Sequence, residues 1–106
     1  MAKTVKMRAS LKDGITTIKA LITHPMETGA RKDQDSGDLV PAHYIQEVDV
    51  SHNGASVMNA YWGTGISKNP YLSFKINGGA AGEKVTLVWK DNLGETGTGE
   101  TEIKQK

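Results

Sequence analysis

Hydrophobic and polar residues alternate along most of this chain. Between Thr4 and Leu11 every second residue is apolar, which is the period of a β-strand with one buried face. The same period predicts strands over residues 17–23, 71–76 and 85–89, the last with Trp89 in the core. Residues 95–103 are mostly polar and include two glycines, so we predict an edge strand or a frayed tail there.

Turn residues separate these runs, and no helical period appears. A further strand is expected from Tyr44 onward, and Asn53-Gly54 then marks a hairpin, which brings the expected number of strands to about seven. Short strands divided by turns are typical of an immunoglobulin-like β-sandwich of two antiparallel sheets. We therefore predict an all-β fold of this kind, with a small barrel as the alternative. The length predicts one domain, residues 1–106.

The hairpin at Asn53-Gly54 predicts a register for the strands on either side. A two-residue loop there places Val50 opposite Val57, and both side chains then point to one face. The residues predicted on the opposite face are Ile45, Met58, Ala60 and Trp62. Apolar residues on both faces indicate that both faces are covered. The face that carries Ile45, Met58, Ala60 and Trp62 is therefore a candidate for a partner interface. A β-bulge would shift this register.

The segment between His24 and His43 is much longer than the usual connection of about 4–6 residues. It is predicted to be a functional loop or a flexible insertion, with a small hairpin around residues 34–37. The two histidines, with Glu27 or Asp33, are candidates for a metal site. Their spacing matches no zinc pattern, so ordinary hydrogen-bonded loop histidines are the favoured interpretation. His52, beside the hairpin turn, is predicted to be exposed.

Charge and composition exclude several functions. Lys+Arg 13 against Asp+Glu 12 gives a net charge of +1, with no general attraction for nucleic acid or a membrane surface. There is no cysteine, and therefore no disulfide, thiolate ligand or cysteine nucleophile in this chain. Neither a serine-nucleophile motif nor a phosphate-binding loop occurs. We expect a binding or scaffolding protein, with no enzymatic activity and no cofactor.

Three blocks of sequence resemble the SoxZ family, and the resemblance extends from Lys3 to about Glu102. The blocks are His24-Pro25-Met26-Glu27-Thr28-Gly29-x-Arg31-Lys32-Asp33, Gly37-x-Leu39-x-Pro41-Ala42-His43-Tyr44-Ile45 and Ala60-Tyr61-Trp62-Gly63-x-Gly65-x-Ser67-Lys68-Asn69-Pro70-Tyr71. SoxZ is the small subunit of the SoxYZ carrier of thiosulfate oxidation. The resemblance implies an immunoglobulin-like sandwich and a heterodimer with SoxY, whose C-terminal Gly-Gly-Cys-Gly-Gly arm holds sulfur intermediates.

The resemblance also implies a periplasmic location, reached by export together with a signal-bearing SoxY. The N-terminal residues alternate in character and do not predict a signal peptide, and no run approaches the about 20 apolar residues that span a bilayer. Other Sox enzymes are expected to dock transiently on the complex. For that docking, the Arg31-Lys32 pair and the Ser67-Lys68-Asn69 loop are candidates because they are cationic.

The hairpin register and the sequence blocks together nominate a SoxY interface. The candidate residues are Met26, Arg31, Pro41, His43, Ile45, Met58, Ala60, Tyr61 and Trp62. The alternative is that these residues only fix the conformation of the long loop and make no contact with SoxY. A second copy of the chain is another expected occupant of an exposed apolar face when SoxY is missing. The rival functions are a stand-alone immunoglobulin-like module that binds protein or carbohydrate, and a metal-dependent enzyme using His24 and His43.

Overall fold

The computed structural model describes residues 5–24, 26–66 and 69–106. The strands are β1 (Val5–Lys12), β2 (Ile15–Ile22), β3 (Ile45–His52), β4 (Ala55–Tyr61), β5 (Tyr71–Asn77), β6 (Lys84–Asp91) and β7 (Thr96–Gln105). The described residues form no helix, and so none that is long and apolar enough to cross a membrane. The predicted all-β class with seven strands is confirmed.

Alternation of apolar and polar residues places one face of each strand in the core, as expected. In β2, Ile18, Ala20 and Ile22 are buried, and the residues between them point outward. In β6, Val85, Leu87 and Trp89 are buried in the same way, which confirms Trp89 as a core residue. The period of two therefore predicts the inward face correctly for these two strands.

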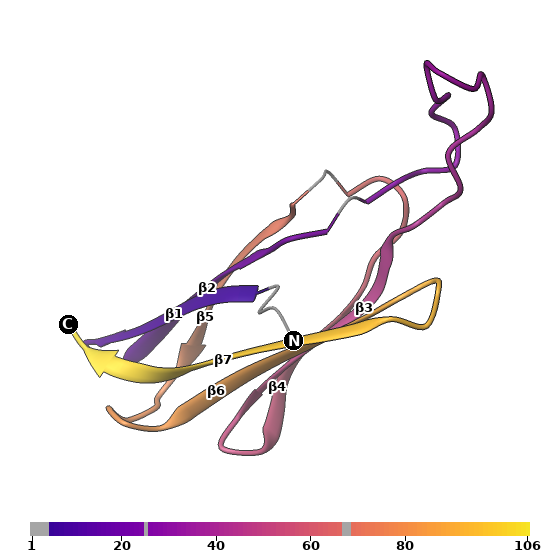
Figure 1. Ribbon diagram of the computed structural model, residues 1–106. Coiled ribbons are helices and arrows are strands. Elements are labelled where there is room, and N and C mark those ends of the chain that lie inside the picture. Colours follow the sequence, from indigo (N-terminus) through magenta and orange to yellow (C-terminus); the bar gives the residue numbers. More distant parts are fainter. Residues whose placement is uncertain (1–4, 25, 67–68) are drawn as a thin grey trace.

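The strands form one mixed sheet in the order β4-β3-β6-β7-β1-β2-β5 (Figure 1). All neighbours are antiparallel except β1 and β7, which are parallel. Side chains from both ends of this sheet pack on the same hydrophobic core, so the sheet is rolled into a nearly closed barrel. The expected division into two antiparallel sheets is not confirmed, because β7 and β1 join the halves.

Strand β7 lies in the middle of the sheet, and the prediction of an edge strand or frayed tail was wrong. It pairs with β6 along seven residues and with β1 on its other side. Gly99 is buried, and a Cβ at this position would lie 2.5 Å from the Cβ of Val5. The glycine is there because β1 crosses too closely for any side chain.

A β-bulge changes the register of the β3–β4 hairpin. The shift lies between Val50 and Ser51, so Val50 pairs with Met58 and Val48 with Ala60. Met58 therefore points to the core side, together with Val50, and the predicted pairing of Val50 with Val57 was wrong. The bulge adds one residue to β4, so every β4 side chain after it points to the opposite face from the one predicted.

The break in the rolled sheet lies between its two edge strands, β4 and β5. Neither strand has a second neighbour in the described sheet. Half-buried apolar side chains approach the core from both sides of the break: Met58, Trp62, Ile66, Leu72, Phe74 and Ile76. We call this region the open seam. It combines unpaired strand edges with apolar side chains that are not fully covered.

Residues 27–43 form an arm that projects from the body (Figure 1). Two isolated β-bridges hold its outgoing and returning segments together, between Glu27 and His43 and between Lys32 and Leu39. The turn at its tip closes with the Gly37 amide donating to the Asp33 carbonyl at 2.8 Å. The predicted small hairpin around residues 34–37 is thus confirmed.

Candidate functional site

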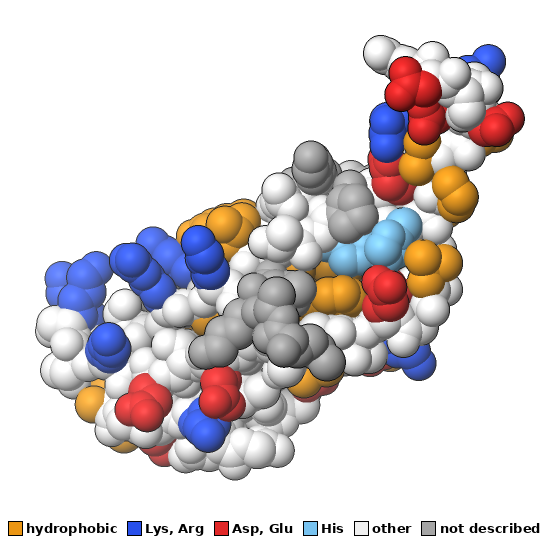
Figure 2. Space-filling model, viewed as in Figure 1, with side chains coloured by type: hydrophobic (Ala, Val, Ile, Leu, Met, Phe, Trp, Pro, Cys, Tyr) orange, Lys and Arg blue, Asp and Glu red, His pale blue; other side chains and the backbone are white. Residues whose placement is uncertain are grey.

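Four side chains meet where the arm joins the body, and we call them the His–Asp cluster: His24, His43, Asp91 and Glu95. Nε2 of His24 lies 3.1 Å from Oδ2 of Asp91, and Nε2 of His43 lies 2.7 Å from the same oxygen. Glu95 Oε2 lies 3.2 Å from His43 Nε2. Figure 2 shows histidine side chains, in pale blue, at the base of the arm. The cluster ties the loop after β2, the arm and the β6–β7 turn to one buried carboxylate.

Asp91 is only 1% exposed, yet each of its oxygens accepts hydrogen bonds. Oδ2 faces the two histidines, and Oδ1 accepts from the backbone amides of Leu93 at 3.0 Å and Glu95 at 2.9 Å. Burial raises the pKa of Asp91, but the hydrogen bonds from His24, His43 and the two amides outweigh it and leave the pKa below its usual value. The carboxylate is therefore ionised at neutral pH.

The hydrogen bonds around His24 assign its tautomer. The backbone amide of Met26 donates to Nδ1 of His24 at 3.1 Å, so Nδ1 carries no proton. The ring proton must then sit on Nε2, from which it is donated to Asp91. His24 itself is 3% exposed, so this arrangement is shielded from water.

The same tautomer decides between a metal centre and a hydrogen-bonded network. Ligand atoms of His24, His43 and Asp91 lie within 4.8 Å of one another, close enough to be considered for a metal ion. A metal-binding histidine needs a free lone pair on the nitrogen that faces the metal, and usually donates from its other nitrogen. In His24 these roles are reversed. The geometry of His24 therefore favours a hydrogen-bonded network rather than a metal centre.

We expect Zn²⁺ to leave the melting temperature of this protein within about 1 °C of its metal-free value at pH 7, because a ligand that does not bind the folded state adds no stability. Thermal unfolding followed by circular dichroism, with and without excess Zn²⁺, measures this. The control is His43→Ala under the same conditions. A rise of several degrees in the natural protein that disappears in His43→Ala would contradict the assignment.

The acids expected beside the histidines have other partners. Glu27 forms an ion pair with Arg31, with 2.6 Å between Oε2 and Nη2, and Asp33 accepts from the backbone amide of Asp35 at 2.8 Å. Asp91 and Glu95 replace them, and sequence analysis missed both. Residues 91–94 form a turn, which accounts for the bonds of Oδ1. Nothing local in the sequence signals the bonds of Oδ2 to His24 and His43, which lie 67 and 48 positions away.

His52 is half-buried, and the prediction that it is exposed was wrong. Its Nε2 lies 2.9 Å from Glu83 Oε1, and the Asn53 side-chain amide donates to the other oxygen at 2.6 Å. The hydrogen bond from His52, followed by one from the Ala80 amide, lowers the pKa of Glu83. This contact braces the β3–β4 turn against the loop before β6.

The nine nominated interface residues fall into three places. Met26 and Ile45 lie in the core, where they have packing roles and almost no surface. Arg31, Pro41 and His43 belong to the arm and its base, with Arg31 engaged by Glu27. Met58, Ala60, Tyr61 and Trp62 lie on or next to β4, along the open seam. Tyr61 is 79% exposed, and Trp62 is half-buried against the core. The Ser67-Lys68-Asn69 loop was the second candidate for the docking of other Sox enzymes. Its residues Ser67 and Lys68 lie outside the described residues.

Solved structures with a similar fold include two of superoxide reductase (neelaredoxin) from Ignicoccus hospitalis. One is of a form with a single substitution, with a TM-score of 0.63, 16% identity, and coverage of 98% of this chain and 81% of that chain. The other has a TM-score of 0.63, 15% identity, and coverage of 97% and 80%. At these identities the likeness is one of fold alone. No curated protein matches the sequence.

A family model settles the broader relationship. The model described as "Sulphur oxidation protein SoxZ" matches residues 5–102, nearly the whole chain. The match covers all three sequence blocks in which the resemblance was seen, and it includes the arm, the hairpin and β4. The chain belongs to the SoxZ family.

Proposed function

We propose that this protein is the non-catalytic subunit of a periplasmic SoxYZ carrier in thiosulfate oxidation, and that it binds and presents SoxY through the open seam. The observation that carries this proposal is the break between β4 and β5. Apolar side chains from both edges are half-buried there, and Tyr61 is exposed on the outer face of the edge strand β4. A surface that joins unpaired backbone edges to uncovered apolar side chains is suited to a stable partner.

Binding at the seam would use two kinds of contact. An added strand or loop of the partner pairs with the backbone of β4 or β5, which have no second neighbour in the described sheet. The side chains of Met58, Trp62 and Phe74 supply apolar area, since they already pack on the core from one side. An exposed tyrosine beside a half-buried tryptophan is also the kind of aromatic pair that dominates many interfaces.

The chemistry of the carrier follows from the composition of this chain. It has no cysteine, so a sulfur intermediate held as a thiol adduct must be attached to the partner. The same feature keeps the carrier thiol from being captured by disulfide exchange within the heterodimer. A periplasmic location follows if export occurs together with SoxY. Fractionation of cells with and without the signal segment of SoxY tests that step.

Tyr61→Ala is expected to weaken SoxY binding at least about tenfold while leaving the melting temperature within about 2 °C, because interface aromatics carry much of the affinity and Tyr61 packs little in the free chain. Trp62→Ala should weaken binding as well, with some loss of stability because Trp62 packs on the core. Leu93→Ala is the matched control, since Leu93 is 59% exposed in the β6–β7 turn and belongs to neither edge strand. Equal effects of Tyr61→Ala and Leu93→Ala on affinity would contradict SoxY binding at the seam.

The decisive experiment mixes the full chain with its SoxY and follows mass by size-exclusion chromatography with light scattering. A stable 1:1 complex supports the proposal. Two separate peaks at micromolar concentration would overturn it and favour a stand-alone binding module. A dimer of the isolated chain that dissociates when SoxY is added would also support the proposal, because both would then compete for one surface.

A further inference from the structure

The outer face of β1, β2 and β5 carries a concentration of positive charge that the balanced composition hides. The outward positions of these strands hold several cations and, apart from the turn residue Asp13 at one end, no acid. Figure 2 shows Lys and Arg side chains gathered over this region, beside exposed hydrophobic ones. We call this surface the basic face and define it by Lys6, Arg8, Lys12, Lys19, Lys75 and Lys106.

The strand register forces these cations close together. Arg8 pairs directly with Lys19 across β1 and β2, so two like charges stand opposite each other on the same face. Lys75 pairs with Thr17, one pleat along from Lys19. Like charges at opposed positions destabilise a sheet, and an acid at either position would relieve the repulsion. The arrangement opposes stability, which points to a role in binding.

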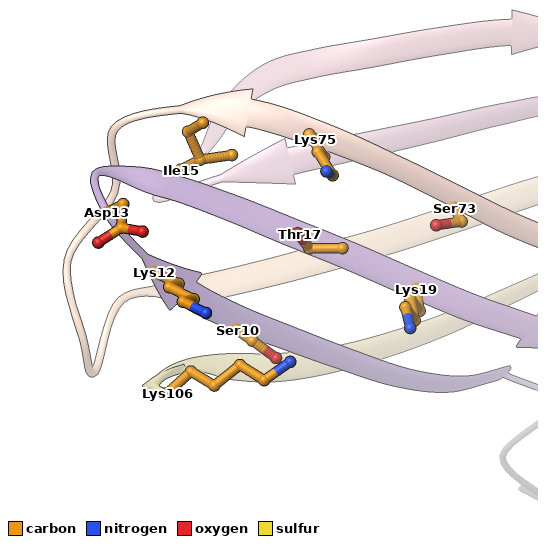
Figure 3. A pocket seen from close by; sticks show the side chains of 9 residues that line it. All are labelled: Ser10, Lys12, Asp13, Ile15, Thr17, Lys19, Ser73, Lys75 and Lys106. Carbon is orange, nitrogen blue, oxygen red and sulfur yellow. The ribbon is translucent and has the colours of Figure 1, made fainter.

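The cations of the basic face have no salt-bridge partner among the described residues. The ion pairs of that part of the chain use Arg31, Lys84 and the three histidines, and none uses a cation of this face. Lys12, Lys19, Lys75 and Lys106 instead surround a shallow hollow of about 540 Å³ (Figure 3). Their charges are available to an external anion.

The other end of the basic face is apolar. Leu21 is 41% exposed and pairs across the strands with Tyr71, which is 60% exposed. Lys6 pairs with Leu21 from the other side, and Lys6, Arg8 and Lys19 line a second depression together with these two residues. The face thus offers an exposed apolar pair next to its cations, which is a composition suited to a protein surface.

The spread of charge selects the class of ligand. Lys6 and Lys12 stand at opposite ends of β1, about 20 Å apart at the usual rise per residue. A small inorganic anion reaches only one or two side chains over such a distance, and β2, at the centre of the face, is paired on both sides with β1 and β5. We propose that the basic face docks an acidic surface of a partner protein. β5 borders both surfaces, but Lys75 points outward on the basic face whereas its seam residues Leu72, Phe74 and Ile76 pack on the core, so the proposal does not depend on SoxY binding at the seam.

The test compares two charge-reversal variants with equal net charge. Lys19→Glu/Lys75→Glu alters the basic face, and Lys84→Glu/Lys90→Glu places the same change on β6, at exposed positions outside that face. The probe is a 20-residue poly-L-glutamate peptide, titrated at low ionic strength against the full chain. We expect the basic-face variant to weaken peptide binding about fivefold or more, and the control by less than about twofold. Added salt should weaken binding to the natural protein.

The melting temperature provides a second, independent measurement. If these cations had only a structural role, replacing one of them would not raise stability and weaken binding together. Lys19→Glu alone places an acid opposite Arg8, so we expect its melting temperature to rise by about 1–4 °C while peptide binding falls. Equal loss of peptide binding in both double variants would overturn the proposal, since net charge alone would explain it. Displacement of the peptide by sulfate, beyond the effect of chloride at equal ionic strength, would also overturn it and indicate a small-anion site. Mixing with SoxY reports on the seam separately.

Discussion

Asp91→Ala is expected to reduce the free energy of unfolding by about 3–5 kcal/mol, because removing one partner of a buried, hydrogen-bonded charge network leaves the others unsatisfied. His24 is the residue that suffers most. Within the described part of the chain its Nε2 proton is donated to Asp91 alone, and Nδ1 already accepts from the Met26 amide. Since domains of this size have about 5–15 kcal/mol in total, much of the stability would be lost. Urea unfolding followed by circular dichroism measures it.

Asp91→Asn should be nearly as damaging as the alanine variant. The Asn side chain has one acceptor oxygen and one NH₂ donor, in place of two acceptor oxygens. In one orientation its NH₂ group faces the N–H of His24, and in the other it faces the backbone amides of Leu93 and Glu95, so two donors oppose each other in either case. The matched control is Glu95→Ala, because the Glu95 side chain contacts only His43 within the cluster and is 62% exposed, while the backbone amide that donates to Asp91 is kept. We expect that control to change the free energy of unfolding by less than about 1 kcal/mol. A loss of that small size in Asp91→Ala would contradict the structural role of the cluster.

The same carboxylate predicts how stability depends on pH. The pKa of Asp91 is lower in the folded chain than its usual value of 3.8, so its contribution is fully present above pH 3.8. The contribution is lost as the pH falls from there through the folded-state pKa. The urea midpoint of the natural protein should therefore decline below about pH 4 more steeply than that of Asp91→Asn, which has no proton to take up.

Gly99→Ala is expected to reduce the free energy of unfolding by about 1–3 kcal/mol, the usual range when a methyl group is forced into a packed core. The new Cβ would lie 2.5 Å from Val5 Cβ, 2.8 Å from its Cγ1 and 3.2 Å from its backbone oxygen. Val5 is branched at Cβ and cannot turn all of these atoms away, so β1 itself has to move.

Gly63→Ala serves as the control for Gly99→Ala, because no heavy atom lies within 4 Å of a Cβ built at Gly63. Differential scanning calorimetry on the two variants compares them directly. Gly99→Val should be worse than Gly99→Ala, since the added methyl groups enlarge the same overlap. Melting temperatures of Gly99→Ala and Gly63→Ala that agree within about 1 °C would contradict the close packing of β1 against Gly99.

The parts of this fold that local patterns control could be predicted from the sequence. Alternation identified the inward residues of β2 and β6, and turn residues located most of the strand ends. β7 was misjudged because its outward residues, Thr98 and Glu100 among them, are polar and its inward position 99 is a glycine. Only the presence of Val5 above that glycine explains it, and this contact links opposite ends of the sequence.

The site was harder to predict than the fold because its contacts are long-range. The histidines were recognised as a pair that brackets a long segment, but the carboxylate between them comes from the end of β6. The hairpin residues Met58 and Trp62 were nominated from a register that one bulge overturned, yet they lie beside the seam for a different reason. That reason is the position of β4 at one end of the sheet, which no pattern within the hairpin reveals.

The parallel pairing of β1 with β7 has a consequence for how this protein folds. It spans only three residue pairs and joins the β2–β1 side of the sheet to the rest, with Gln105 bonding to Leu11 from 94 positions away. Each side contains an antiparallel hairpin that can form early, whereas this junction closes a loop of nearly the whole chain. We expect slow folding limited by the junction, with amide hydrogens of Ala9 to Leu11 among the last to gain protection from exchange.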